Sequence, residues 1–268
     1  MQVRRSRAGT RIGGILLLAA SVAFLDARAF AEQVAVLHSE GLTHGFLVLR
    51  TLEGKTLADG EITQFAEGHL VRTHLVFRFR DGSLYEERAQ YSQNGKFKLV
   101  SDHLIQKGPA FTHPIETSID VASGHLVCRY TEDDGTETIA DEHMSLPDDV
   151  ANGLLFTLLR HIKPTAPQTV VSQVAMTPKP KIVQLTITPR GEEPFSIGIN
   201  RYKAMHYVVK VKIGGIAGLV APLVGKQPAD MHVWIKHDDV PAFVKFEGPI
   251  YNGGPTWRVE LADAAKFR

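Results

Sequence analysis

The chain has one cysteine in 268 residues, and after residue 31 it has no apolar run long enough to cross a membrane as a helix. A single cysteine cannot form an internal disulfide, so the folded chain depends on its core for stability. Cys128 lies in the strand-like stretch 124–130, where a buried and unreactive thiol is expected.

Several motifs of catalysis and cofactor binding are also missing. The sequence has no Gly-x-Ser-x-Gly, which excludes the usual α/β-hydrolase arrangement, and its 12 histidines show no His-Glu-x-x-His spacing. The stretch 220–227 contains Gly-Lys, but Val220 and Gln227 stand where a phosphate-binding loop needs Gly and Ser or Thr. We therefore predict no cofactor, no metal ion and no catalytic residue.

The N-terminus has the order of a secretory signal peptide. Four arginines precede Ile12, an apolar run extends to Leu25, and small residues follow at 26–31. The apolar run is shorter than the roughly 20 residues that span a bilayer, which favours cleavage over a membrane anchor. We predict a signal peptide at 1–31 and a periplasmic or secreted location in a bacterium.

Net charge and length limit the partners and the number of domains expected of the chain after cleavage. Removing 1–31 takes away five arginines and one aspartate, so the formal net charge changes from +1 to −3. A weakly acidic protein has no electrostatic footprint for nucleic acid. The remaining length suits one large domain, and we predict a single β-rich domain over 32–268, without a transmembrane segment.

The clearest structural signal is the alternation of residues 71–80. Apolar side chains such as Phe77 and Phe79 share one face, whereas the other face carries basic side chains such as Arg72 and His74. This pattern predicts a strand with one buried face and one wet face. Asp81-Gly82 is a strong turn signal, so residues 83–91 are predicted to return as the second strand of a hairpin.

The register of this hairpin depends on its loop. A two-residue loop at 81–82 places Glu86 opposite Phe77, whereas a three-residue loop at 81–83 places Glu86 opposite Arg78 and Tyr85 opposite Phe79. We favour the longer loop, because an unpaired buried carboxylate costs several kcal/mol. Glu87 then faces the apolar side of the hairpin and needs a partner.

Two further segments interrupt the strands. Residues 147–162 have the caps, charges and apolar stripe of a helix that packs on the sheet. The segment 214–226 is apolar and rich in glycine, and it is either a lid over an apolar cavity or a buried crossover.

Some polar residues could meet across strands. His74 with His103, and His206 with His232, are candidate pairs, although scattered strand histidines are usually surface or core residues. An enzyme built on this chain would need groups such as Glu87, His103 and His206 to converge in a cleft.

The candidate ligand-binding residues are mostly aromatic or aliphatic. Such side chains either line a concave apolar surface or form the ordinary core between sheet and helix. The set comprises Phe77, Phe79, Glu87, Tyr207, Leu219, Leu223, Trp234, Phe243 and Trp257.

Residues 231–247 read Met-His-Val-Trp-Ile-Lys-His-Asp-Asp-Val-Pro-Ala-Phe-Val-Lys-Phe-Glu. This strand with Trp, followed by a turn, Pro and a second strand, resembles the closing hairpin of bacterial lipoprotein-carrier-like (LolA/LolB-like) proteins and related envelope families. The resemblance implies a strongly curved antiparallel sheet, or half-open barrel, with helix and loop plugging an apolar cavity. Together with the strand patterns and the helix at 147–162, it leads us to predict a mainly β fold with one central helix and a covering loop. It also implies binding of acyl chains in the periplasm.

The function that we predict is binding or carrying a lipophilic ligand, a hydrophobic small molecule or acyl chain, in the cell envelope. The alternative is a non-enzymatic envelope scaffold or interaction protein whose core is full. A hydrolase or isomerase is the third hypothesis.

Overall fold

The computed structural model describes residues 31–197, 200–213 and 228–262. Within these ranges, strands form one 14-stranded sheet with antiparallel neighbours throughout, accompanied by one short helix. The fold is mainly β, as predicted. No helix in these ranges is long and apolar enough to span a bilayer. Residues 1–30 of the predicted signal peptide, and the predicted covering loop with Leu219 and Leu223, lie outside the described residues.

The first half of the sheet contains the strands that precede the helix. They are β1 (Thr43–Arg50), β2 (Thr56–Glu67), β3 (Leu70–Phe79), β4 (Leu84–Ser92), β5 (Lys98–Lys107), β6 (Ile115–Asp120), β7 (His125–Thr131) and β8 (Glu137–His143).

The helix and the second half of the sheet follow. They are α1 (Leu155–His161), β9 (Thr169–Ala175), β10 (Lys181–Ile197), β11 (Asn200–Lys212), β12 (Met231–Lys236), β13 (Ala242–Gly248) and β14 (Trp257–Leu261).

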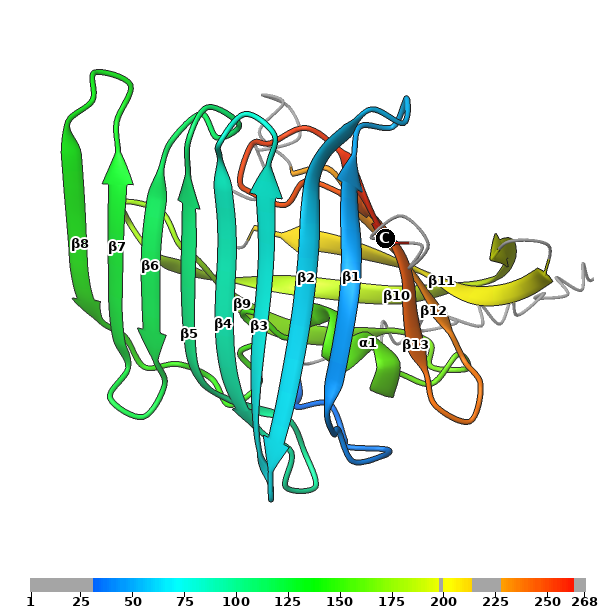
Figure 1. The fold of residues 1–268 in the computed structure, drawn as a ribbon. Coiled ribbons are helices and arrows are strands. Elements are labelled where there is room, and N and C mark those ends of the chain that lie inside the picture. Colours follow the sequence, from blue (N-terminus) through cyan, green and yellow to red (C-terminus); the bar gives the residue numbers. More distant parts are fainter. Residues whose placement is uncertain (1–30, 198–199, 214–227, 263–268) are drawn as a thin grey trace, which may run out of the picture.

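The order of the strands explains the shape of the sheet. From β1 the chain adds strands outward to β8, then crosses to β9 at the opposite edge and returns strand by strand to β14, which pairs with β1. In Figure 1, β9 to β11 cross behind the upright strands β1 to β7 at a steep angle. The sheet therefore folds over itself without closing in the described ranges, which confirms the curved, half-open architecture.

The core lies between the two halves of the folded sheet. Phe77 and Tyr91 enter it from the first half, Tyr207 and Ile235 from the second half, and Leu158 from α1. Burying an aromatic or aliphatic side chain of this kind contributes about 1.5–3 kcal/mol. The alternation in β3 follows from this arrangement, because one face of the strand meets the core and the other meets water.

The β3–β4 hairpin differs from both predicted registers. Tyr85 lies opposite Phe77 and Glu86 lies opposite Val76, and the Phe79 amide donates to the Ser83 carbonyl. The loop has three residues, as preferred, but they are 80–82 rather than 81–83, because Gly82 takes the positive φ of 87° that the turn requires. Glu87 still faces the apolar side, as predicted.

The helix is central, as predicted, but much shorter than 147–162. Asp149 and Asn152 accept hydrogen bonds from the backbone amides of Ser172 and Val174, so the segment before α1 runs along strand β9 instead of coiling. Gly153 then adopts a φ of 66°, which is incompatible with a continuous helix.

The short helix lies between the two halves of the sheet. Its Phe156 ring packs 5.0 Å from the ring of Phe243 on β13, measured between centroids. On the other side, Arg160 donates a hydrogen bond to Gln64 on β2. α1 therefore fills space that the two halves enclose.

Candidate functional site

Most of the predicted ligand-binding aromatics lie in the packed core. Phe79 contacts the rings of Phe111 and Trp257 with centroids 5.4 and 5.6 Å away. Phe77 packs edge-on against Tyr85, and the Tyr207 hydroxyl donates to the carbonyl of Ile162 at 2.7 Å. These side chains fill the interior between the halves, and their role in binding a ligand stays a prediction.

Trp234 lies on the outer face of the second half. Its ring stacks on His206 at 4.5 Å between centroids, its indole N–H donates to Glu193 at 2.7 Å, and Lys245 lies over the ring at 3.7 Å. The predicted pair His206 and His232 does meet, with 2.9 Å between Nε2 and Nδ1. Both nitrogens of His206 have protein partners, so this cluster is a packed surface feature.

The third hypothesis needed Glu87, His103 and His206 to converge, and they do not. Glu87 faces the interior from β4, His103 lies on the outer face of β5, and His206 belongs to the other half of the sheet. These three residues therefore form no catalytic site.

The neighbour that Glu87 does have is Asp102, which the sequence analysis missed. Burial raises the pKa of Glu87 to about 7, although a hydrogen bond of 3.1 Å from the Tyr85 hydroxyl opposes the rise. Burial, and then the charge of Glu87, raise the pKa of Asp102 well above its usual value. The fold thus holds two interacting carboxyl groups in its interior.

A second polar cluster joins the segment before β1 to α1. Glu40 accepts hydrogen bonds from Arg160 at 2.8 Å, His161 at 2.8 Å and Gln64 at 2.7 Å. Burial works against the charge of Glu40, but the hydrogen bond from His161 and the Arg160 charge outweigh it, so the pKa of Glu40 lies below its usual value. Glu40 is therefore a buried carboxylate with matched donors.

The same cluster has the composition of a metal site, since the ligand atoms of His38, Glu40 and His161 lie within 4.8 Å of one another. However, Nδ1 of His161 accepts the backbone N–H of Leu37 at 3.1 Å, so the ring carries its proton on Nε2 and donates it to Glu40. A metal ion on Nε2 would push the proton to Nδ1, against the N–H of Leu37. Arg160 already neutralises the carboxylate. The hydrogen-bond pattern fits a structural ion pair.

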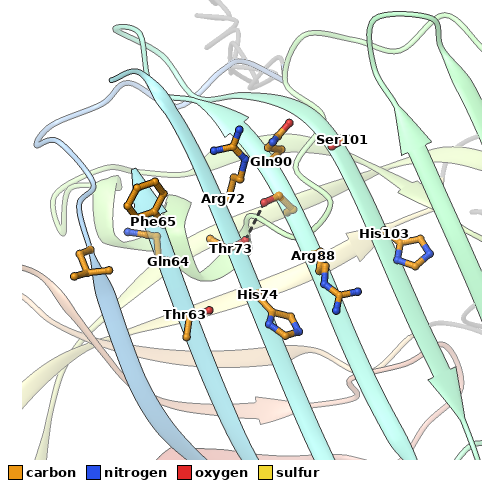
Figure 2. A pocket seen from close by; sticks show the side chains of 12 residues that line it. Thr63, Gln64, Phe65, Arg72, Thr73, His74, Arg88, Gln90, Ser101 and His103 are labelled. Atoms are coloured by element: carbon orange, nitrogen blue, oxygen red, sulfur yellow. Dashed lines mark hydrogen bonds between the residues drawn. The ribbon is translucent and has the colours of Figure 1, made fainter. Parts of the chain in front are cut away.

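The outer face of β2 to β5 carries a shallow hollow of about 440 Å³. Figure 2 shows Arg72 and Gln90 near one end and His74, Arg88 and His103 along the other, whereas Gln64, which donates a hydrogen bond to the interior Glu40, belongs to the inner face. The lining comprises Leu42, Thr63, Gln64, Phe65, Arg72, Thr73, His74, Arg88, Ala89, Gln90, Ser101 and His103. It contains two arginines and two histidines but no carboxylate.

Carboxylates lie around the hollow instead. Glu86 binds both His74, at 2.7 Å, and Arg88, so one carboxylate is shared by two basic side chains. His103 binds Glu116 at 3.1 Å. The predicted pair of His74 and His103 does not form, because Arg88 lies between them in the register of β3, β4 and β5.

One end of the hollow is apolar and exposed. Leu42 is 82% exposed and Phe65 is 54% exposed. The arginine side chains are accessible as well, at 47% for Arg72 and 54% for Arg88. The hollow therefore presents accessible cationic groups next to an apolar edge.

The sequence held a partial signal for this site. The wet face of 71–80 carries Arg72, His74, Arg78 and Arg80 without an acidic residue. What the sequence alone does not give is the register that brings Arg88 and His103 beside Arg72 and His74.

No protein-family model and no curated protein match the chain. It is similar to a solved structure from Brucella abortus, described as a β-barrel-like protein of a domain of unknown function, DUF1849. The match has a TM-score of 0.47 and 8% sequence identity, and it covers 84% of this chain and 98% of that chain. It identifies no ligand or site, and the resemblance to lipoprotein carriers stays a prediction.

Proposed function

We propose that this chain is a binding protein for a lipophilic molecule with an acidic head group, which it binds in the hollow on the outer face of β2 to β5. The observation that supports the proposal is the lining itself. It joins two accessible guanidinium groups to the exposed Leu42 and Phe65, without a carboxylate among the lining residues.

The ion pairs already present leave room for an anion. Arg72 pairs with Glu67 at 3.3 Å, but both side chains are exposed, and such surface pairs contribute only about 0–1 kcal/mol. Arg88 shares Glu86 with His74, so a single negative charge faces two basic groups. A ligand carboxylate or phosphate can replace or supplement these contacts through charge-assisted hydrogen bonds.

The apolar part of the ligand would lie against Phe65 and Leu42. Each buried CH₂ group contributes about 0.8 kcal/mol, so a few methylenes covering this edge give a useful share of the affinity. A binding protein of this kind fits the predicted cell-envelope location, which rests on the N-terminal segment alone.

The test is a titration of the chain with a fluorescent fatty acid and with the matching alcohol of equal chain length. We expect saturable binding of the acid and at least roughly tenfold weaker binding of the alcohol, a difference of about 1.4 kcal/mol. Arg88→Gln should weaken binding of the acid by a similar factor. Phe65→Ser should weaken binding of both ligands.

Arg129→Gln is the matched control. Arg129 is an exposed arginine on β7 that pairs with Glu137 at 3.7 Å and does not line the hollow. Equal affinity for acid and alcohol, or equal effects of Arg88→Gln and Arg129→Gln, would contradict the proposal. No binding of either ligand would favour the scaffold alternative, in which the exposed side chains contact a protein.

A further inference from the structure

Three buried side-chain atoms lack a hydrogen-bond partner among the described residues: Asp102 Oδ1, Thr117 Oγ1 and Thr186 Oγ1. Two of them are neighbours. Asp102 on β5 pairs with Ile119 on β6, and Thr117 lies two residues earlier on the same face of β6. Diagonal neighbours of this kind have Cα atoms about 7–8 Å apart. Unsatisfied buried groups are rare in folded proteins, so two together need an explanation, and a bound ion is one.

The surroundings of Asp102 are rich in oxygen and short of positive charge. Asp102 is only 3% exposed, and Glu87 is close enough for its charge to act on Asp102. The Tyr85 hydroxyl donates to Glu87 at 3.1 Å. In the described part of the chain, no Lys, Arg or His forms an ion pair with either carboxylate.

The chain also approaches this place from the helix side. Gly153 lies so near that a Cβ atom there would be 2.7 Å from Asp102 Oδ1 and 2.7 Å from the Cβ of Ala89. The glycine therefore lets the backbone approach the unpartnered oxygen closely, where any larger residue would clash.

We propose that Glu87 and Asp102 bind a hard divalent cation of the Ca²⁺ class in the interior of the sheet. Glu87 and Asp102 are diagonal neighbours across β4 and β5, so one such ion can neutralise both carboxylates. Thr117 and Tyr85 supply further oxygen atoms close by. This site is separate from the outer-face hollow and shares no residue with it.

The ligand set favours oxygen-binding ions over softer metals. Ca²⁺ and Mg²⁺ take carboxylate and hydroxyl oxygens, whereas Zn²⁺ and Cu⁺ prefer imidazole and thiolate. Cys128 lies opposite Thr117, but burial raises the pKa of its thiol to about 11, so it stays protonated. The larger Ca²⁺, which tolerates irregular geometry, suits this site better than Mg²⁺.

The experiment measures thermal unfolding of the full chain in a chelator and at increasing CaCl₂, at constant ionic strength. A ligand that binds only the folded state raises Tm with its free concentration, so we expect a steady rise above the dissociation constant. Native mass spectrometry should show one Ca²⁺ per chain. Asp102→Asn and Glu87→Gln should each remove the Tm rise, whereas Asp141→Asn, which changes an exposed carboxylate on β8, should not.

If Asp102→Asn does not fold, Tb³⁺ luminescence measures binding directly in the unaltered chain. Tb³⁺ takes the place of Ca²⁺, and excitation of the nearby Tyr85 ring should sensitise its emission in the unaltered chain. Tyr85→Phe removes both the sensitiser and one nearby oxygen atom, so it should strongly reduce this emission and weaken the Ca²⁺-dependent rise in Tm without abolishing it. The proposal would be overturned if Tm does not change with CaCl₂ concentration and the chain binds no Tb³⁺. A response that survives both carboxylate substitutions would overturn it as well.

Discussion

Replacing Glu40 with glutamine should destabilise the fold strongly. The carboxylate accepts hydrogen bonds from Arg160, His161 and Gln64, all between 2.7 and 2.8 Å. Glutamine keeps the shape but puts an NH₂ group where one oxygen accepted, and it removes the only negative charge that pairs with Arg160 among the described residues. The substitution therefore leaves a partly buried cation without its partner.

The expected cost follows from this loss. Removing one partner of a buried ion pair typically costs 3–5 kcal/mol. The Arg160 side chain keeps some contact with water, so we expect the lower end, about 3 kcal/mol. With a urea m-value of about 3 kcal/mol/M for a protein of this size, the unfolding midpoint should fall by about 1 M. Urea unfolding followed by tryptophan fluorescence and by circular dichroism measures this shift.

Glu67→Gln is the matched comparison, because it removes the carboxylate of the exposed pair with Arg72. It should cost less than about 1 kcal/mol. The double variant Glu40→Gln with Arg160→Met should recover part of the loss, since it also removes the unpaired charge. If Glu40→Gln lowers the free energy of unfolding no more than Glu67→Gln does, the buried cluster does not stabilise the packing of the segment before β1 on α1.

Three further outcomes follow from the structure. Burial, and then the neighbouring His161, hold the pKa of His38 in the folded chain below 6.5. The unfolded chain therefore binds more protons, and stability falls as the pH drops through 6.5. His38→Gln should lose less stability than the unaltered chain over this pH range, as measured by urea midpoints. Gly153→Ala should cost about 2–4 kcal/mol in urea unfolding, because its φ is positive and its Cβ would overlap Ala89. Gly135→Ala, with a positive φ but open space, should cost only about 1–2 kcal/mol. Phe77→Ala should cost about 3–5 kcal/mol, yet leave the fatty-acid affinity of the folded chain unchanged.

Side-chain periodicity made much of the sheet predictable. The alternation in 71–80 identified β3 and its buried face, because a strand between core and water must alternate. The turn at Asp81-Gly82 was also identified, but its register was wrong by two residues. A shift of two keeps every side chain on its face, so the hydrophobic pattern could not distinguish these registers.

The helix was predicted too long for a different reason. The caps and apolar stripe of 147–162 satisfied local rules, but Asp149 and Asn152 form better hydrogen bonds with β9. A strand some twenty residues away in sequence supplies these partners, so local patterns could not reveal them.

The polar clusters were the least predictable features. Glu40 and Arg160 are 120 residues apart, and Glu87 and Asp102 meet only when β4 and β5 pair. Glu87 was correctly expected to face the apolar side and to need a partner, yet the neighbour that the fold supplies is a second acid. Sequence alone gave no sign that its neighbour would carry the same charge.

Photolabelling tests the central claim most directly. A fatty acid with a photoreactive acyl chain is bound to the full chain, irradiated, and its attachment sites are mapped by mass spectrometry. The proposed site predicts labels at Leu42, Phe65 and other outer-face residues of β2 to β5, reduced by excess unlabelled acid and by Arg88→Gln. Labels confined to inner-facing residues such as Tyr207 and Phe243 would contradict it and place the ligand within the folded sheet.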